Sequence, residues 1–261
     1  MTVQQAIDRI MSGIPGERLE RTVDTVKAGN PGRRLTGIVT TFMATRAVLA
    51  RAAELGANLV ITHEPAYYNH LDETDWLAGD PVYESKKRFI EANKLVVWRF
   101  HDYWHRHQPD GILTGLVRKL GWKKYQCGEG SRHFKLPRMT LRGLAETARK
   151  ALGIKHVRIA GDPEMPCSAV ALGLGYSGGR EQMTDLRRDD VDVVICGESA
   201  EWETCEYVRD ASFENRRKGL VILGHCDSEE SGMEYLAEWL KDRLPGIPVQ
   251  HVPAGNPLVT Y

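Results

Sequence analysis

The stretch ANLVITHEP, residues 57–65, is the part of the sequence that best indicates the fold class. Its apolar run Leu59–Thr62 is short and uninterrupted, which is typical of a strand buried on both faces of a parallel sheet. A helical pattern over 44–55 precedes it and ends at Gly56, and a β-branched segment, 35–41, lies before that helix. Strand, helix and strand in succession form a βαβ unit, so the sequence predicts an α/β protein.

The same alternation continues toward the C-terminal end of the chain. Apolar and β-branched runs predict further strands, and segments with a 3.6-residue period predict the helices between them. The expected strands are 95–100, 169–174, 192–196, 219–223 and 249–252. The expected helices are 3–11, 85–93, 115–120, 141–152, 180–188, 203–218 and one that begins near Asp227.

The two halves of the chain resemble each other. A shift of 134 residues places 60–64 on 194–198 and Ile38 on Leu172 without a gap. Both copies read strand, helix, strand and acidic turn. We interpret this as an internal duplication with halves of approximately 1–120 and 140–261 within a single domain, 1–261. The alternative is that two unrelated βαβ units resemble each other at this level.

Composition excludes several classes of protein. Lys and Arg number 35 and Asp and Glu also number 35, so the balance is not that of a dedicated nucleic-acid binder. The five cysteines are odd in number and form no CxxC motif, which favours a reducing compartment. Residues 1–11 lack the apolar core of a signal peptide, and no apolar run approaches about 20 residues. We expect a cytoplasmic protein without a membrane span.

Histidines follow three of the expected strands: His63 after 59–62, His101 and His105 after 95–100, and His225 after 219–223. Ligands of α/β sheets bind outside the carboxyl ends of the strands, so these side chains would converge at one edge of one sheet. Glu229, four residues after His225, adds a carboxylate. Imidazole and carboxylate together suit Zn, Fe, Mn or Co. The alternative is that each histidine is an ordinary surface residue.

A glycine-rich turn, 173–179, follows a strand and precedes a helix. Such a turn can present backbone N–H groups to an anion, and its candidate phosphate contacts are Gly175, Ser177 and Gly178. It has neither a Walker A lysine nor the dinucleotide-binding spacing. The alternative is that the glycines only permit a tight turn with positive φ.

At these residues the sequence resembles the Nif-three-like dinuclear metal-centre family, whose members are also called GTP cyclohydrolase 1 type 2 homologues. The resemblance rests on 57–65, on the Gly-His-x3-Glu motif at 224–229, on Cys-Gly-Glu at 196–198 and on Asn-Pro-Leu at 256–258. It spans nearly the whole chain. It implies two similar, intertwined α/β/α layered units, and assembly as a hexamer, a trimer of dimers with a central cavity.

Two positions depart from the family pattern. Glu64 stands where the family has the second histidine of a pair, and His105 stands where it has an aspartate four residues after the middle histidine. The family pattern carries over directly to His63, His225 and Glu229. We expect one or two divalent ions per chain, with candidate ligands His63, Glu64, His101, His105, His225 and Glu229.

Two functions follow from this ligand set. The first is a metal-dependent hydrolase acting on a purine nucleotide such as GTP, in which Glu64 or Glu198 is the general base. The second is a non-enzymatic hexamer that binds metal or a partner protein. A third interpretation is an α/β scaffold with fortuitous histidines.

Overall fold

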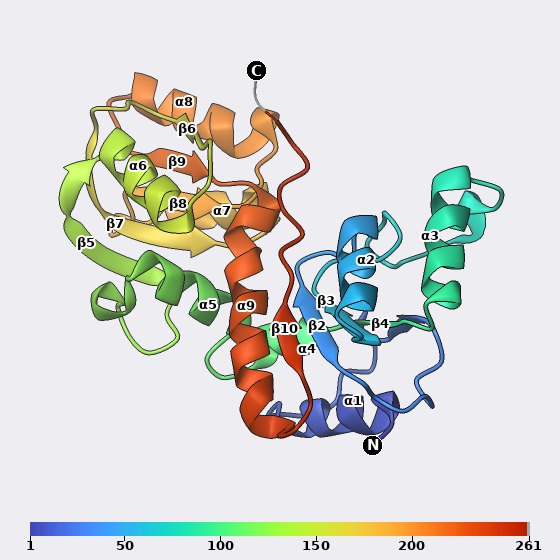
Figure 1. The fold of residues 1–261 in the computed structure, drawn as a ribbon. Helices are drawn as coiled ribbons and strands as arrows, with labels where there is room; N and C mark the ends of the chain where they lie inside the picture. Colours follow the sequence, from blue (N-terminus) through green and yellow to red (C-terminus); the bar gives the residue numbers. More distant parts are fainter. Residues whose placement is uncertain (260–261) are drawn as a thin grey trace. The chain divides into compact units, whose positions relative to one another are not determined.

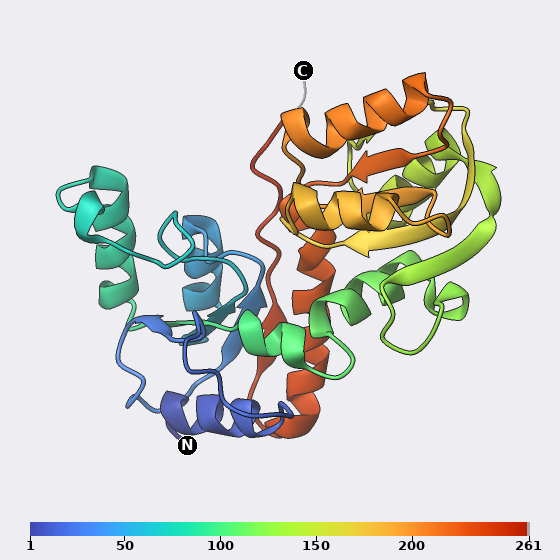
Figure 2. The ribbon, with the colours of Figure 1, turned by 180° about the vertical axis from the view of Figure 1, so that it is seen from behind.

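The computed structural model describes residues 1–259, which form two compact units (Figure 1; Figure 2 from behind). Unit 1 comprises Met1–Ile112 and Gly232–Ala254, and unit 2 comprises Leu113–Ser231 and the segment from Gly255 onward. The chain therefore leaves unit 1, forms unit 2 and returns to unit 1. This discontinuous course agrees with the intertwined units that the family resemblance implies.

Unit 1 is built on a five-stranded sheet with the order β1-β4-β3-β2-β10. The strands β2, β3, β4 and β10 run parallel, and β1 pairs antiparallel with β4. Every residue of β2, β3 and β4 is buried, as expected for a parallel sheet covered on both faces. The bounds are β1 Val26–Ala28, β2 Ile38–Thr41, β3 Leu59–Thr62, β4 Val96–Arg99 and β10 Val249–His251.

Three helices of unit 1, α1, α2 and α3, begin at side chains that cap them. Thr45 accepts a hydrogen bond from Val48 at the start of α2, and Asp80 caps α3 with Pro81 at its first position. This cap starts α3 four residues before the expected Ser85. The bounds are α1 Val3–Ser12, α2 Arg46–Glu54, the 3₁₀ turn η1 Asp75–Leu77, α3 Pro81–Ala92 and α4 Asp102–Arg106. Helix α5, Gly111–Leu120, continues into unit 2.

Lys86 on α3 is a buried cation. Its side chain is 4% exposed, its Nζ donates to the carbonyl of Ala66, and burial lowers its pKa to about 8. From pH about 8 to about 10.5 the unfolded chain therefore holds this proton while the folded chain loses it.

We expect the free energy of unfolding of the wild type, relative to a Lys86→Met variant, to rise across that window. The slope should approach about 1.4 kcal/mol per pH unit. Urea unfolding of both proteins at several pH values measures it. Parallel pH profiles of the two proteins would show that Lys86 titrates normally.

Unit 2 has the sheet order β5-β7-β8-β9-β6 and repeats four strands of unit 1, but its fifth strand, β5, pairs antiparallel with β7, whereas β10 pairs parallel with β2. The parallel strands β7, β8 and β9 correspond to β2, β3 and β4, and β6 pairs antiparallel with β9 as β1 does with β4. The bounds are β5 His133–Thr140, α6 Leu141–Leu152, β6 Arg158–Ala160, β7 Pro166–Gly173, α7 Gly179–Leu186, β8 Val193–Cys196, α8 Glu206–Phe213 and β9 Gly219–Ile222. Shorter turns are η2 Lys123–Tyr125 and the π-helical η3 Glu201–Cys205, and α9, His225–Arg243, continues into unit 1.

The shared topology supports the internal duplication. β3 begins at Leu59 and β8 at Val193, which is the shift of 134 residues expected from the sequence. One expectation is wrong: the strand before His225 is β9, which lies in the second sheet and not in the sheet of β3 and β4. The apolar pattern of a buried strand does not specify which sheet the strand joins. Among residues 1–259, no helix combines the length and the apolar character of a membrane span.

Candidate metal centre

Three histidines of unit 1 come together at the carboxyl ends of two neighbouring strands. His63 follows β3, while His101 and His105 follow β4, its parallel neighbour. Each offers a ring nitrogen, and these nitrogens lie within 4.8 Å of one another. The ring centroids are 4.5 Å apart for His63 and His101, 5.1 Å for His63 and His105, and 4.9 Å for His101 and His105. The structure thus confirms that these strand ends bring imidazoles together.

Asp24 holds the start of α4, whose N-cap residue is His101 and which contains His105. Its Oδ1 accepts hydrogen bonds from the backbone N–H of His101 (2.8 Å) and Asp102 (3.0 Å), and its Oδ2 accepts one from Tyr103 (2.9 Å). A carboxylate here satisfies the unpaired donors at the start of α4. Burial raises the pKa of Asp24. With α4 fixed, His101 and His105 are four residues apart and share one helix face.

Each of the three rings places its Nδ1 beside an oxygen acceptor. The pairs are His63 with the Phe100 carbonyl (3.4 Å), His101 with Asp102 Oδ1 (2.9 Å) and His105 with Asp110 Oδ2 (2.9 Å). An Nδ1–H donated to such an acceptor leaves the lone pair on Nε2, the tautomer of metal-ligating histidine. The bond from His101 also lowers the pKa of Asp102. The surroundings of the rings therefore favour metal binding.

His63 is fully buried. Burial lowers its pKa well below the usual value, and the neighbouring rings of His101 and His105 lower it further. A neutral imidazole is the form that binds a metal ion. The His63 ring is therefore ready to act as a ligand at neutral pH.

Arg99 holds Glu64 beside the three histidines. Its side chain is 0% exposed, and its Nε donates to the carbonyl of His63 at 3.1 Å. One terminal nitrogen lies 3.4 Å from Glu64 Oε2, and the other donates to the carbonyl of His70. Glu64 Oε1 lies 3.7 Å from His101 Nε2. The fixed guanidinium thus keeps one carboxylate next to the imidazole nitrogens.

This donor set fits a divalent transition metal. Three imidazoles and one carboxylate are ligands that Zn, Fe, Mn and Co accept. The three imidazoles expected as ligands, His63, His101 and His105, thus lie together, with the Glu64 carboxylate beside His101.

A substitution of Asp110 tests whether the acceptors beside Nδ1 support metal binding. We expect Asp110→Asn to weaken metal affinity about 10–100-fold, because the amide no longer orients and polarises His105 as a carboxylate does. Competition with a chromophoric chelator measures the change. Asp8→Asn, on the exposed face of α1, is the matched control. Equal affinities of the two variants would contradict the assigned role of Asp110.

A second set of predicted residues meets within unit 2. His225 and Glu229 lie one turn apart at the start of α9, with 3.2 Å between His225 Nε2 and Glu229 Oε2. Glu198, which follows β8, lies with its Oε1 2.9 Å from His225 Nδ1. Glu198 thus has the place beside His225 that Asp110 has beside His105. This contact makes it a positioning residue for the ring.

The glycine-rich turn of unit 2 lies against carboxylates. Gly175 has a φ of +55°, and a Cβ there would clash with Glu229 and lie 2.8 Å from His225 Nε2. Gly178 is the N-cap of α7, and a Cβ on the next residue, Gly179, would clash with Glu203. Glycine is therefore needed at Gly175 for close approach to the His225–Glu229 pair. Two carboxylates beside the turn disfavour the phosphate expected at Gly175, Ser177 and Gly178.

The sequence did not indicate Asp24, Arg99 or Asp110 as parts of the site. Asp24 lies 77 positions before His101, and nothing in its neighbourhood links the two. Arg99 reads as one residue within the expected apolar strand, 95–100. Asp110, five residues after His105, was within reach of a search for acidic residues near each histidine.

Known proteins resemble most or all of this chain. A "GTP cyclohydrolase 1 type 2 homolog" of Clostridium perfringens is 25% identical over 219 residues, which is 79% of this chain and 78% of that protein. A solved Bacillus cereus protein related to NIF3 covers 100% of this chain and 99% of its own, with a TM-score of 0.80 and 13% identity. The Staphylococcus aureus hypothetical protein SA1388 covers the same shares, with a TM-score of 0.79 and 16% identity.

The sequence profile of one family matches residues 1–256, almost the entire chain. This match agrees with the resemblance found in the motifs at 57–65 and 224–229. The chain belongs to the Duf34/NIF3 (NGG1p interacting factor 3) family.

Proposed function

We propose that this protein is a metal-dependent hydrolase whose metal ion is bound by His63, His101 and His105. The observation that carries the proposal is the convergence of three ring nitrogens within 4.8 Å, each ring backed by an acceptor at Nδ1. Three protein ligands are typical of catalytic metal sites, which keep a coordination position for water or substrate.

Glu64 is the proposed general base. Its carboxylate lies beside His101 and is held by Arg99, so it can accept a proton from a water molecule at the histidines. A divalent metal supplies the acidity that this step needs, since it lowers the pKa of water from about 15.7 to about 7. Arg99 keeps the carboxylate in place by its bond to the backbone of His63.

His225 and Glu229 are proposed as further metal ligands. Imidazole and carboxylate are both suitable donors, and Glu198 fixes the ring of His225 through Nδ1. With these donors the chain would have enough ligands for the one or two divalent ions expected from the sequence.

The proposed substrate class is a purine nucleotide such as GTP. Two curated relatives, 25% and 23% identical to this chain, carry the name "GTP cyclohydrolase 1 type 2 homolog". Hydrolytic opening of a purine ring requires activated water beside a general base; a metal ion held by the histidines would supply the first, and Glu64 the second.

The test is turnover of GTP, with ATP and CTP as comparison substrates, by protein loaded with Mn, Fe or Zn. We expect GTP hydrolysis that disappears with chelator and in His63→Ala. Glu64→Gln should keep its metal and lose about 10²–10⁴-fold in kcat. Chromatography of the nucleotide products measures both effects. Absence of turnover with every metal and nucleotide, or undiminished turnover in His63→Ala, would overturn the proposed hydrolase.

The second candidate is a non-enzymatic, hexameric metal-binding protein. It is favoured by the two positions, Glu64 and His105, at which this chain departs from the ligand pattern of the family it resembles. Metal bound stoichiometrically without turnover of any nucleotide would support this candidate over the hydrolase. Light scattering of the purified protein tests the hexamer.

A further inference from the structure

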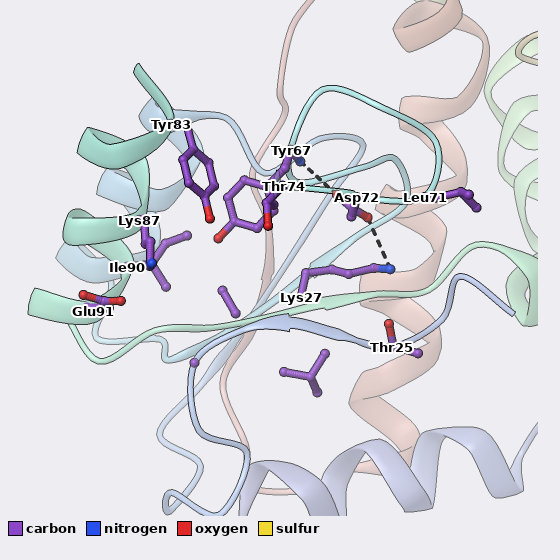
Figure 3. A pocket seen from close by; sticks show the side chains of 13 residues that line it. Thr25, Lys27, Tyr67, Leu71, Asp72, Thr74, Tyr83, Lys87, Ile90 and Glu91 are labelled. Carbon is purple, nitrogen blue, oxygen red and sulfur yellow. Dashed lines mark hydrogen bonds and ion pairs between the residues drawn. The ribbon is translucent and has the colours of Figure 1, made fainter. Parts of the chain in front are cut away.

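A cavity of about 480 Å³ lies in unit 1 (Figure 3). Its walls are β1, the loop 67–74 and one face of α3. None of its lining residues belongs to the histidine cluster or to the metal-ligand candidates. This volume is in the range that accommodates a small organic molecule.

Two tyrosine side chains line the cavity. Tyr67 is 4% exposed and Tyr83 is 8% exposed, and their rings meet edge to face at 5.2 Å. Both hydroxyls point into the same space between α3 and the loop (Figure 3). Neither hydroxyl hydrogen-bonds to a residue within 1–259. Both hydroxyls face the cavity, so they are available to donate hydrogen bonds to the oxygen acceptors of a ligand there.

The hydroxyl of Tyr67 remains a donor at physiological pH. Burial, together with the nearby Tyr83 and Asp72, raises its pKa to about 12. A protonated phenol beside a second phenol can donate two hydrogen bonds to one ligand group, such as the two oxygens of a carboxylate.

The buried charges around the cavity favour a monoanion. Lys27 is paired with Asp72 at 3.3 Å, and Arg99 lies near both Asp72 (3.7 Å) and Glu64 (3.4 Å). Lys86 has its ammonium 5.7 Å from the centre of the Tyr67 ring and forms no ion pair with a carboxylate within residues 1–259. The charged residues that line the cavity balance one another, because Lys27 and Lys87 match Asp72 and Glu91 in number. Lys86, behind Tyr67, is therefore the nearby buried cation that a single negative charge could balance, whereas a phosphate dianion would leave a charge uncompensated.

The rest of the cavity lining consists of apolar residues and of charged residues that are exposed to solvent. Ile90, Val26 and Ala28 supply hydrocarbon surface, and Lys87 and Glu91 are exposed residues of opposite charge on α3. From these features we propose that the cavity binds a small organic monocarboxylate. Its carboxylate accepts hydrogen bonds from Tyr67 and Tyr83, and its hydrocarbon part lies against Ile90 and β1. This inference is independent of the proposed hydrolase.

The test is calorimetric titration of the full chain with straight-chain monocarboxylates from acetate to octanoate, and with benzoate. We expect saturable binding of at least one of them below about 10 mM. The matching primary amide should bind at least about tenfold more weakly, because it lacks the charge. The double variant Tyr67→Phe/Tyr83→Phe should lose at least about tenfold in affinity, since both donors are removed with little change in shape.

Tyr68→Phe is the matched control. Tyr68 is a neighbour of Tyr67 on the same loop, is 52% exposed and does not line the cavity, so its loss should leave the affinity unchanged. His63→Ala should also bind the carboxylate normally, which separates this site from the metal centre. The proposal is overturned if none of the carboxylates binds saturably, if the amides bind equally well, or if the double tyrosine variant retains wild-type affinity.

Discussion

Replacing His63 with alanine is expected to strip the purified protein of most of its transition metal. His63 is the fully buried member of the histidine cluster, and its neutral ring is held by the Phe100 carbonyl. Loss of a ligand should exceed the roughly 10–100-fold loss that follows removal of a supporting acceptor, so we expect at least about 100-fold weaker binding. Elemental analysis of protein dialysed against a weak chelator measures the metal retained.

The control for this change is His156→Ala, which removes an exposed histidine from unit 2 and should leave the metal content as in the wild type. His105→Ala should follow His63→Ala, because its ring belongs to the same cluster. Equal metal content in His63→Ala and His156→Ala would show that the cluster is not a metal site.

Replacing Arg99 with methionine is expected to destabilise unit 1 by about 3–5 kcal/mol, the cost of breaking a buried ionic network. The guanidinium is fully buried. It donates hydrogen bonds to the carbonyls of His63 and His70 and forms ion pairs with Glu64 and Asp72. Methionine keeps much of the side-chain volume but leaves these acceptors without their donor. Urea unfolding measures the free energy of the variant.

Two further variants isolate the cause. Arg51→Met breaks an exposed ion pair with Glu54 and should change the free energy of unfolding by no more than about 1 kcal/mol. Adding Asp72→Asn to Arg99→Met should cost less than the sum of the two single changes, because the buried carboxylate is then uncharged. Similar losses in Arg99→Met and Arg51→Met would contradict the structural role of Arg99.

Much of the fold was predictable because its signals are local. The apolar runs that became β3 and β8 are uninterrupted and end at turns, and the expected duplication places them 134 residues apart as observed. Helix α3 starts before the expected Ser85 because Asp80 and Pro81 form its N-terminal cap, a signal that lies outside the apolar periodicity. The assignment of β9 to a second sheet was missed because strand periodicity reports burial and says nothing of which strands pair.

The site was predictable to the extent that strand order brings strand ends together. His63 and His101 meet because β3 and β4 are parallel neighbours, with Thr62 beside Arg99 in register. The residues that orient the rings were not predictable in the same way. Asp24 reaches α4 from a distant loop, and Arg99 acts through a side chain that the apolar context of β4 does not suggest.

X-ray absorption at the metal edge of zinc-loaded protein tests the central claim most directly. The account predicts nitrogen ligands at about 2.0–2.1 Å with the outer-shell scattering of imidazole rings, most of which disappears in a His63→Ala/His101→Ala/His105→Ala variant. A spectrum without imidazole scattering, or one unchanged by the triple substitution, would contradict it.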